Sequence, residues 1–287
     1  NQLREMFHQE AAPQALEAPK GVEIPSLHIF KLTDEEIRRM KAEVRGEEEL
    51  DMVAELEGMP LAIELAAAFG PAVSSDLDAT LAAVADLAGR RVTLHQELAE
   101  RHGVHILAGS GPVKTSDGRY VNAAQLVTPK GLVGEQEKII MTPFERDWGI
   151  SPGGPLRVFD TDLGMIGVAI CYDSEFPLLV RALAEAGAEI VLVPSCTERV
   201  SGFHRVATGA KARALENTIV TVQSPTVGDA LWSPAVDRNS GLAAIYVPSE
   251  HGVSDTGVVA QGILDKSMWV AGTVDLARLR RIRSTGE

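Results

Sequence analysis

Residues 165–195 read MIGVAICYDSEFPLLVRALAEAGAEIVLVPS. Apolar residues dominate 165–170 and again 190–194, as in two buried strands. Between them, 177–186 carries leucines and alanines at helical spacing, and Gly187 supplies the residue that commonly follows a helix end. A strand, a helix and a strand in this order form a crossover, which joins parallel strands. The stretch therefore predicts an α/β fold with a buried parallel pair.

The rest of the chain repeats this mixture of helices and strands. The predicted elements are a short strand at 26–30, charged helices over 32–58, a helix over 75–101, strands over 103–111, 121–131 and 137–145 with a hairpin turn at 116–120, two strands over 157–171, a helix and a strand over 204–225, and strands over 241–249 and 269–276. The strands are many and apolar, which is typical of sheets covered by helices. We expect a layered α/β architecture.

The composition is that of an ordinary soluble globular protein, with 45 % hydrophobic and 23 % charged residues in a chain of 287. Two cysteines argue against a disulfide scaffold and suit a reducing compartment. No apolar run is long enough to cross a bilayer, and the N-terminal NQLREMFHQE lacks the apolar centre of a signal peptide. A cytoplasmic location without membrane contact is the expectation.

The net charge of −13 argues against nucleic acid as a partner, because the phosphate backbone would be repelled on average. One basic cluster, RLRRIR at 278–283, stands against this acidic balance. We interpret it as a solvated helix face or a contact with a partner.

Several kinds of chemistry are disfavoured by the motifs. The glycine-rich stretches match neither the dinucleotide fingerprint nor the Walker loop, and no G-x-S-x-G elbow is present. The seven histidines show no metal-binding spacing. We expect no cofactor and no metal.

Cys171 ends an apolar strand just before a helix that begins near Pro177. Such a residue points to the carboxyl edge of the sheet, where open α/β folds bind ligands. The N-terminus of the helix favours a thiolate. The position suits a nucleophile, although a buried cysteine that only fills the core is the alternative.

Three segments resemble those of one family, and they occur in that family's order. GMIGVAICYDSEFPLLVRALAEAGAEIVLVPSCTE is similar to the cysteine segment of the nitrilase superfamily of carbon-nitrogen hydrolases, EKIIMTPFERDWGISPG to its lysine segment, and HRVATGAKARALENTIVTVQSP to its helix-strand segment. Lys138 and Cys171 lie 33 residues apart, about the family's usual interval. The resemblance covers roughly residues 60 to 287.

The resemblance implies a four-layer αββα sandwich that pairs into a homodimer or a larger homo-oligomer. It divides the chain into a carbon-nitrogen hydrolase domain over 51–287 and an atypical N-terminal segment over 1–50, partly helical or poorly ordered. The family's chemistry uses a Glu-Lys-Cys triad and a thioester intermediate.

Carried over residue by residue, the resemblance makes Cys171 the nucleophile and the Tyr172 backbone N–H an oxyanion donor. Lys138 is the cation of the oxyanion site, and Glu145 matches a second glutamate that orients the substrate or the triad.

Cys196 and Thr197 fall in a segment that often lines the substrate site in the family, although Cys196 is also a plausible small apolar neighbour of the pocket. Arg213 and Glu216 match the Ala-Arg-Ala-x-Glu-Asn segment, where we expect a structural ion pair.

The catalytic base is the point at which the sequence departs from the family. The best counterpart of the base segment is DMVAELE at 51–57, which assigns Glu57 and requires two extra residues afterwards. Glu64 is the runner-up, and an ungapped match leaves neither in place. The strand at 26–30 is a poor substitute for the family's opening strand.

Tyr172 and Asp173 follow the cysteine, where true nitrilases tend to carry Trp-Glu, and this favours a small amide as substrate over a nitrile. Asp173, Glu175 and Glu145 would make the vicinity acidic, which favours neutral or cationic amides. The alternative function is a catalytically impaired family member that binds a small metabolite or a protein.

Overall fold

The computed structural model describes residues 27–28, 81–82, 85, 88–230 and 236–286. The two candidates for the base, Glu57 and Glu64, lie outside the described residues, as does the domain boundary expected at 50/51.

The first sheet is a mostly antiparallel meander with four strands. Its strands are β2 (Ile106–Lys114), β3 (Tyr120–Thr128), β4 (Gly131–Glu137) and the short β5 (Ile150–Ser151), which runs parallel to the start of β3. The predicted hairpin turn is confirmed between β2 and β3, where the Thr115 N–H donates to the Arg119 carbonyl at 2.8 Å. The helix α6 (Ala88–His102) packs on this sheet and supplies the C-terminal part of the helix predicted over 75–101.

The second sheet has six strands in the order β13-β12-β9-β8-β7-β6. Its strands are β6 (Val158–Thr161), β7 (Gly164–Val168), β8 (Ile190–Ser195), β9 (Val220–Pro225), β12 (Ala244–Tyr246) and β13 (Val258–Gln261). The central three, β7, β8 and β9, are parallel. β6 pairs antiparallel with β7, β12 pairs antiparallel with β9, and β13 pairs antiparallel with β12. The crossovers are α8 (Pro177–Glu185) and α9 (Val200–Asn217), so the predicted strand-helix-strand unit is confirmed.

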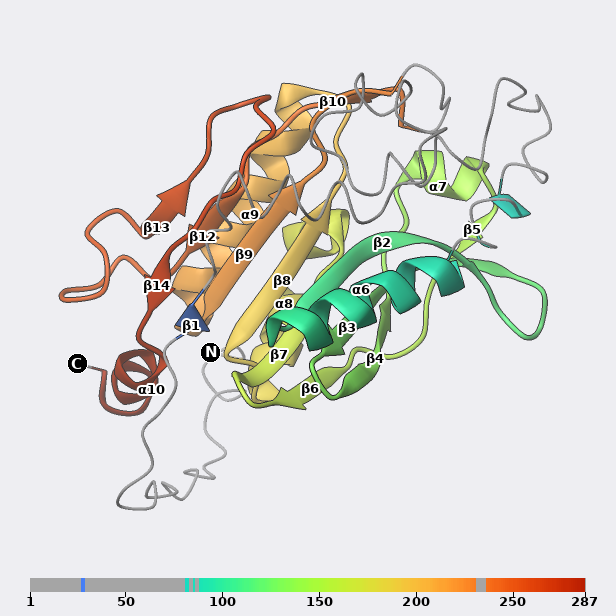
Figure 1. The fold of residues 1–287 in the computed structure, drawn as a ribbon. Helices are drawn as coiled ribbons and strands as arrows, with labels where there is room; N and C mark the ends of the chain where they lie inside the picture. Colours follow the sequence, from blue (N-terminus) through green and yellow to red (C-terminus); the bar gives the residue numbers. More distant parts are fainter. Residues whose placement is uncertain (1–26, 29–80, 83–84, 86–87, 231–235, 287) are drawn as a thin grey trace, which may run out of the picture.

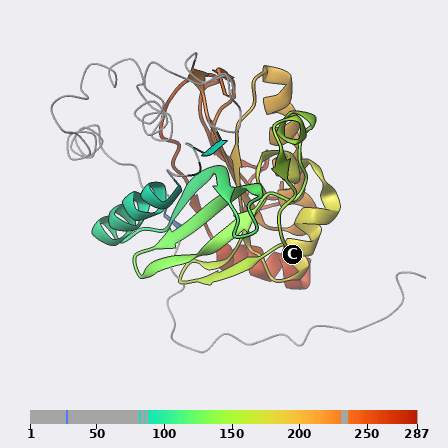
Figure 2. The same cartoon turned by 90° about the vertical axis from the view of Figure 1, so that its right-hand side faces the viewer.

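The two sheets face each other, and helices cover their outer faces (Figure 1). Figure 2 shows α6 on one side of the sheets and the helices α8 and α9 on the other. One continuous core joins residues of β3, such as Leu126, to Val168 and Ile190 of the second sheet and Val206 of α9. The four-layer αββα arrangement predicted for the chain is therefore confirmed, because each sheet buries one face against the other sheet and one against helices.

Short elements complete the described structure. They are β1 (Leu27–His28) paired with β14 (Thr273–Val274), β10 (Gly228–Asp229) paired with β11 (Arg238–Asn239), α7 (Pro143–Asp147), the 3₁₀ turn η3 (Cys171–Glu175) and α10 (Leu276–Thr285). The described residues contain no helix with the length and apolarity needed to span a membrane.

The basic cluster at 278–283 lies on α10, and three of its arginines form contacts with other parts of the chain. Arg280 pairs with Glu189 (Nη2 to Oε2, 2.8 Å), Arg283 Nη1 donates to the Ala188 carbonyl at 3.2 Å, and Arg278 Nη2 donates to the His251 carbonyl at 2.9 Å. These contacts attach α10 to neighbouring segments of the chain. Arg280, Arg281 and Arg283 are exposed, so the solvated helix face expected from the sequence is confirmed, and the partner contact stays a prediction.

Two strand predictions were wrong. The strand expected to end at 111 continues to Lys114, because Gly109 (φ 68°) forms a bulge in β2 instead of a turn. The strand expected over 137–145 is absent, because β4 ends at Glu137 and Thr142 with Pro143 starts α7. The strand ending at Glu137 leaves Lys138 at the edge of the sheet.

Candidate active site

Cys171 sits in a strained turn after β7. The strand ends at Val168, the Ala169 N–H still donates to the Leu192 carbonyl at 3.0 Å, and Cys171 then takes a left-handed φ of 50° at the start of η3. A residue other than glycine in this conformation costs about 1–3 kcal/mol and is found mostly at functional sites. The side-chain hydroxyl of Ser174 donates to the Cys171 carbonyl at 2.7 Å and holds the turn.

Lys138 is fixed through its backbone from both sides. Its N–H donates to the Asn122 carbonyl on β3 at 2.7 Å, and its carbonyl accepts the Gly153 N–H at 2.8 Å. A Cβ atom at Gly153 would lie 2.7 Å from the Lys138 carbonyl oxygen and 2.3 Å from Cβ of Glu137, so only glycine fits there. The loop and the sheet therefore hold the lysine backbone tightly.

The Lys138 ammonium is buried and paired with Glu145. Nζ lies 2.6 Å from Oε2, and the side chains are 3 % and 15 % exposed. Oε2 also accepts the backbone N–H and the hydroxyl of Thr142, both at 2.9 Å, in the capping box of α7. The other oxygen, Oε1, accepts Nδ2 of Asn122 at 3.1 Å.

Glu145 is ionised in this setting. Burial by itself would raise the pKa of its carboxyl group, but the Lys138 ammonium and the hydrogen bonds from Thr142 and Asn122 outweigh burial and hold the pKa below its ordinary value. The pair thus places a buried ammonium and its counter-charge just after the end of β4.

Asp173 joins the lysine segment to the cysteine turn. Its carboxylate accepts the N–H of Ile140 at 2.8 Å and that of Ile139 at 3.2 Å, and these residues directly follow Lys138. The side chain is 1 % exposed. Lys138 and Cys171 are brought into the same site by this link, and the lysine charge acts on the thiol, lowering its pKa.

The thiol pKa differs from the expectation. Burial raises the pKa of Cys171 above its ordinary value, and the Lys138 charge together with hydrogen bonding to the backbone of Cys196 and Tyr172 offsets only part of this rise. The helix α8 begins at Pro177 as expected, and the turn η3 lies between it and Cys171. Activation of the thiol by this helix end stays a prediction. A thiol of this kind requires a base to become a nucleophile at neutral pH.

Cys196 lies beside the nucleophile. The Cys171 Sγ donates to the Cys196 carbonyl at 3.5 Å, and the Cys196 residue is exposed. The Cys196 Sγ donates to Oδ1 of Asn239 at 3.0 Å, while the surrounding protein atoms raise the pKa of this thiol to about 11. The Thr197 side chain is buried and donates to the Ser240 carbonyl at 2.7 Å. The substrate-binding roles of Cys196 and Thr197 remain predictions.

The acidic vicinity expected around the thiol is largely compensated. Glu145 is paired with Lys138, Asp173 is held by two backbone N–H groups, and Glu175 lies 3.2 Å from Arg205. The expected preference for neutral or cationic amides therefore loses its electrostatic support.

The helix α9 packs directly against the cysteine turn. A Cβ atom at Gly209 would lie 2.8 Å from the Ser174 carbonyl oxygen, so glycine is needed for this approach. Arg213 forms the expected structural ion pair with Glu216, with two contacts of 2.8 Å, and its Nη1 also donates to the Ser174 carbonyl at 3.4 Å.

Sequence reasoning missed Asn122 as a site residue and read Asp173 only as a charge. Asn122 is a polar residue near the start of the apolar strand β3, and that irregularity was the available signal. Asp173 carried no comparable signal, because its partners lie 33 and 34 residues away.

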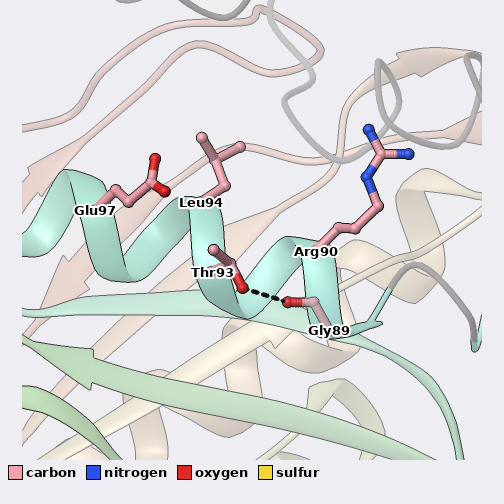
Figure 3. Close-up of a pocket in the computed structure, with 5 residues that line it drawn as sticks. All are labelled: Gly89, Arg90, Thr93, Leu94 and Glu97. Atoms are coloured by element: carbon pink, nitrogen blue, oxygen red, sulfur yellow. Dashed lines mark hydrogen bonds between the residues drawn. The ribbon is translucent and has the colours of Figure 1, made fainter.

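A hollow of about 380 Å³ lies elsewhere, on the surface of α6 (Figure 3). Gly89, Arg90, Thr93, Leu94 and Glu97 line it, and the Thr93 hydroxyl donates to the Gly89 carbonyl at 3.1 Å. No residue of the cysteine site contributes to it, so we assign it no part in the chemistry. Among the described residues, no group of three or more His, Cys, Asp or Glu side chains is arranged to hold a metal ion.

Comparison with curated proteins finds hydrolases and amidases. The chain is 41 % identical over 196 residues to the probable hydrolase YhcX of Bacillus subtilis, covering 68 % of this chain and 38 % of YhcX. It is 33 % identical over 145 residues to the deaminated glutathione amidase of Yersinia enterocolitica, covering 46 % and 51 % of the two chains. The chain thus spans about half or less of these two relatives. The omega-amidase NIT2-B of Xenopus laevis is 29 % identical over 207 residues, with 68 % and 70 % covered.

Solved structures share the fold. Nit3 of Saccharomyces cerevisiae, a member of the nitrilase superfamily, superposes with a TM-score of 0.59 at 22 % identity, covering 68 % of both chains. An amidase from Nesterenkonia sp. gives a TM-score of 0.57 at 21 % identity, covering 74 % of this chain and 75 % of the amidase. A sequence model of the carbon-nitrogen hydrolase family matches residues 64–258 and so includes the cysteine, lysine and helix-strand segments. Since this match spans more than half of its residues, the chain belongs to the carbon-nitrogen hydrolase family.

Proposed function

We propose that the protein is an amidase that cleaves the carbon-nitrogen bond of a small amide through a thioester on Cys171. The observation that carries this proposal is the buried Lys138–Glu145 pair, which Asp173 links to the strained turn of Cys171. A buried ammonium that is held in place by its partners is suited to stabilise an oxyanion that forms beside it.

The reaction begins at a thiol that is protonated at neutral pH. A carboxylate base takes the thiol proton, sulfur forms a bond to the amide carbon, and the carbonyl oxygen gains negative charge. Lys138 and the Tyr172 N–H stabilise that charge. The carbon-nitrogen bond then breaks, and the base returns the proton to the departing ammonia or amine.

Water completes the cycle. The same base takes a proton from water, the oxygen adds to the thioester, and the carbon-sulfur bond breaks to release the acid and restore the thiol. Glu145 does not suit the role of base, because its lowered pKa makes it a weak proton acceptor and its oxygens are already paired with Lys138, Thr142 and Asn122. We assign the base to Glu57, with Glu64 as the runner-up.

The relatives support the amide class of substrate. A deaminated glutathione amidase and an omega-amidase are among the similar curated proteins. A solved mutant of the Nesterenkonia sp. AN1 amidase shows acrylamide added at that protein's active site cysteine.

The test is a search for a covalent adduct by mass spectrometry after incubation with a panel of small amides. We expect an acyl group on the peptide that contains Cys171, acid formation in the same reaction, and neither in Cys171→Ala. The impaired-member alternative predicts amide binding without adduct or acid, and that result would replace the hydrolase proposal.

The base assignment has its own test. Glu57→Gln should lower kcat/KM about a hundred- to ten-thousandfold, which is the usual contribution of a general base, and Glu64→Gln should not. The opposite pattern would move the base to Glu64, and no loss from either change would remove both.

A further inference from the structure

Asp173 is a carboxylate in a place where a charge is unfavourable. It is 1 % exposed, and among the described residues its hydrogen bonds are the two backbone N–H groups of Ile139 and Ile140. Burial raises its pKa to about 6, and the backbone hydrogen bonds and the Lys138 charge offset only part of the burial effect. A buried group that disfavours its own charged form stabilises the fold poorly at neutral pH, which suggests another reason for its presence.

The geometry supplies that reason. The two N–H groups belong to the residues that directly follow Lys138, and Asp173 itself is two residues after Cys171. The carboxylate therefore spans the gap between the end of the first sheet and the turn of the second. An amide side chain has one acceptor oxygen and cannot accept both N–H groups equally well.

The charged groups around this link come from the end of β4 and from α7, α9 and η3. Lys138 and Glu145 face it from the end of β4 and from α7, and their charges pair with each other. Arg213 of α9 donates to the carbonyl of the neighbouring Ser174 and pairs with Glu216. Glu175, at the end of η3, pairs with Arg205.

We propose that Asp173 is a positioning residue, whose ionised carboxylate sets the distance between the Lys138 ammonium and the Cys171 sulfur through the backbone of Ile139 and Ile140. This inference rests on the proposed function. Misplacement of a catalytic group by about 1 Å costs on the order of a hundredfold in rate. Protonation of Asp173 removes half of its accepting capacity, so the link weakens in acid.

The experiment compares the wild type with Asp173→Asn, and uses Asp160→Asn as a matched control that makes the same charge change at an exposed position of β6. We expect Asp173→Asn to lower kcat about a hundredfold at pH 7.5 with KM changed less than about threefold. The control should keep its activity. Hydrogen exchange of the peptide over 137–142 should become faster in Asp173→Asn at pH 7.5 and not in Asp160→Asn.

The ratio of the two kcat values over pH separates positioning from simple structural damage. Groups shared by both proteins cancel in this ratio, so it should stay constant above pH 7 and fall toward one as Asp173 protonates below about pH 6. If Asp173→Asn does not fold, the wild type decides the question. The kcat of the wild type should then fall as the pH is lowered, with a midpoint near pH 6, while near-ultraviolet circular dichroism shows that the packing is intact.

The outcomes are distinct. A wild type that hydrolyses no amide overturns the proposed function and this role together. An active wild type with an unchanged kcat in Asp173→Asn, or a loss that is the same at pH 5 and pH 8, overturns the positioning role alone.

Discussion

The Lys138 ammonium and the Glu145 carboxylate each depend on the other, because both are largely removed from water. Taking away one partner of such a pair leaves a buried charge without compensation, which costs more than the pair itself contributes. The same reasoning applies to Asn122, which holds the lysine backbone with its carbonyl and Glu145 with its amide. Single residues of this site therefore support its stability as well as the chemistry proposed for it.

Replacing Glu145 with glutamine tests this dependence. Glu145→Gln should lower the free energy of unfolding by about 3–5 kcal/mol in urea titrations at pH 7, because Lys138 loses its counter-charge. Glu185→Gln removes the exposed pair with Arg181 and should cost less than about 1 kcal/mol. Equal losses in the two variants would contradict the assignment of a buried, mutually dependent pair.

The contribution of Asp173 to the free energy of unfolding changes with pH in the opposite direction from that of Glu145. Its pKa in the folded protein is raised from 3.8 to about 6, so its favourable contribution is complete below pH 3.8 and is lost as pH rises through 6. The free energy of unfolding of Asp173→Asn minus that of the wild type should therefore rise by about 2 kcal/mol between pH 4 and pH 7. Urea titrations of both proteins at four pH values measure this difference. A difference that does not change with pH would exclude the raised pKa of Asp173.

At the scale of elements, the site depends on how closely the segments approach. The loop at Gly153 lies against the Lys138 backbone, and α9 lies against η3 at Gly209. In both places the neighbouring atoms include backbone, which cannot move as a flexible side chain can. The sequence shows these glycines but not the atoms that they meet.

Gly209→Ala tests how closely α9 must pack against the turn that contains Cys171. The new methyl group would lie 2.8 Å from the Ser174 carbonyl oxygen and 3.2 Å from Cα of Glu175, so we expect a loss of about 1–3 kcal/mol in stability and a lower kcat. Gly89→Ala in α6 is the control, since nothing lies within 4 Å of its added Cβ. The control should stabilise the protein by about 0.4–1 kcal/mol in the same thermal or urea unfolding assay. A neutral Gly209→Ala would mean that α9 can shift freely.

At the scale of the whole molecule, the outer helix layer presents large apolar side chains. Leu178 of α8 is 82 % exposed and Leu215 of α9 is 55 % exposed. We propose that this layer forms the interface of the homodimer that the family resemblance implies. Contiguous exposed apolar residues are typical of association surfaces.

Leu178→Glu should weaken this dimer, because a carboxylate would be buried where an apolar side chain packed. Sedimentation equilibrium should show a dissociation constant raised at least tenfold relative to the wild type. Leu132→Glu, at a 52 % exposed position on β4, should leave the association unchanged. A monomeric wild type would remove the proposal.

The sequence by itself determined the α/β class and the crossover from β7 to β8, and it singled out Cys171 and Lys138 as candidate site residues. Local periodicity defines helices and strands, and the order of three segments identified the family. The sequence did not determine that β4 ends just before Lys138, that burial raises the pKa of the Cys171 thiol, or that Asp173 and Asn122 belong to the candidate site. Only the tertiary structure decided these points, because burial and hydrogen bonds across 23 to 34 residues arise from the meeting of two sheets and leave no periodic trace in the chain.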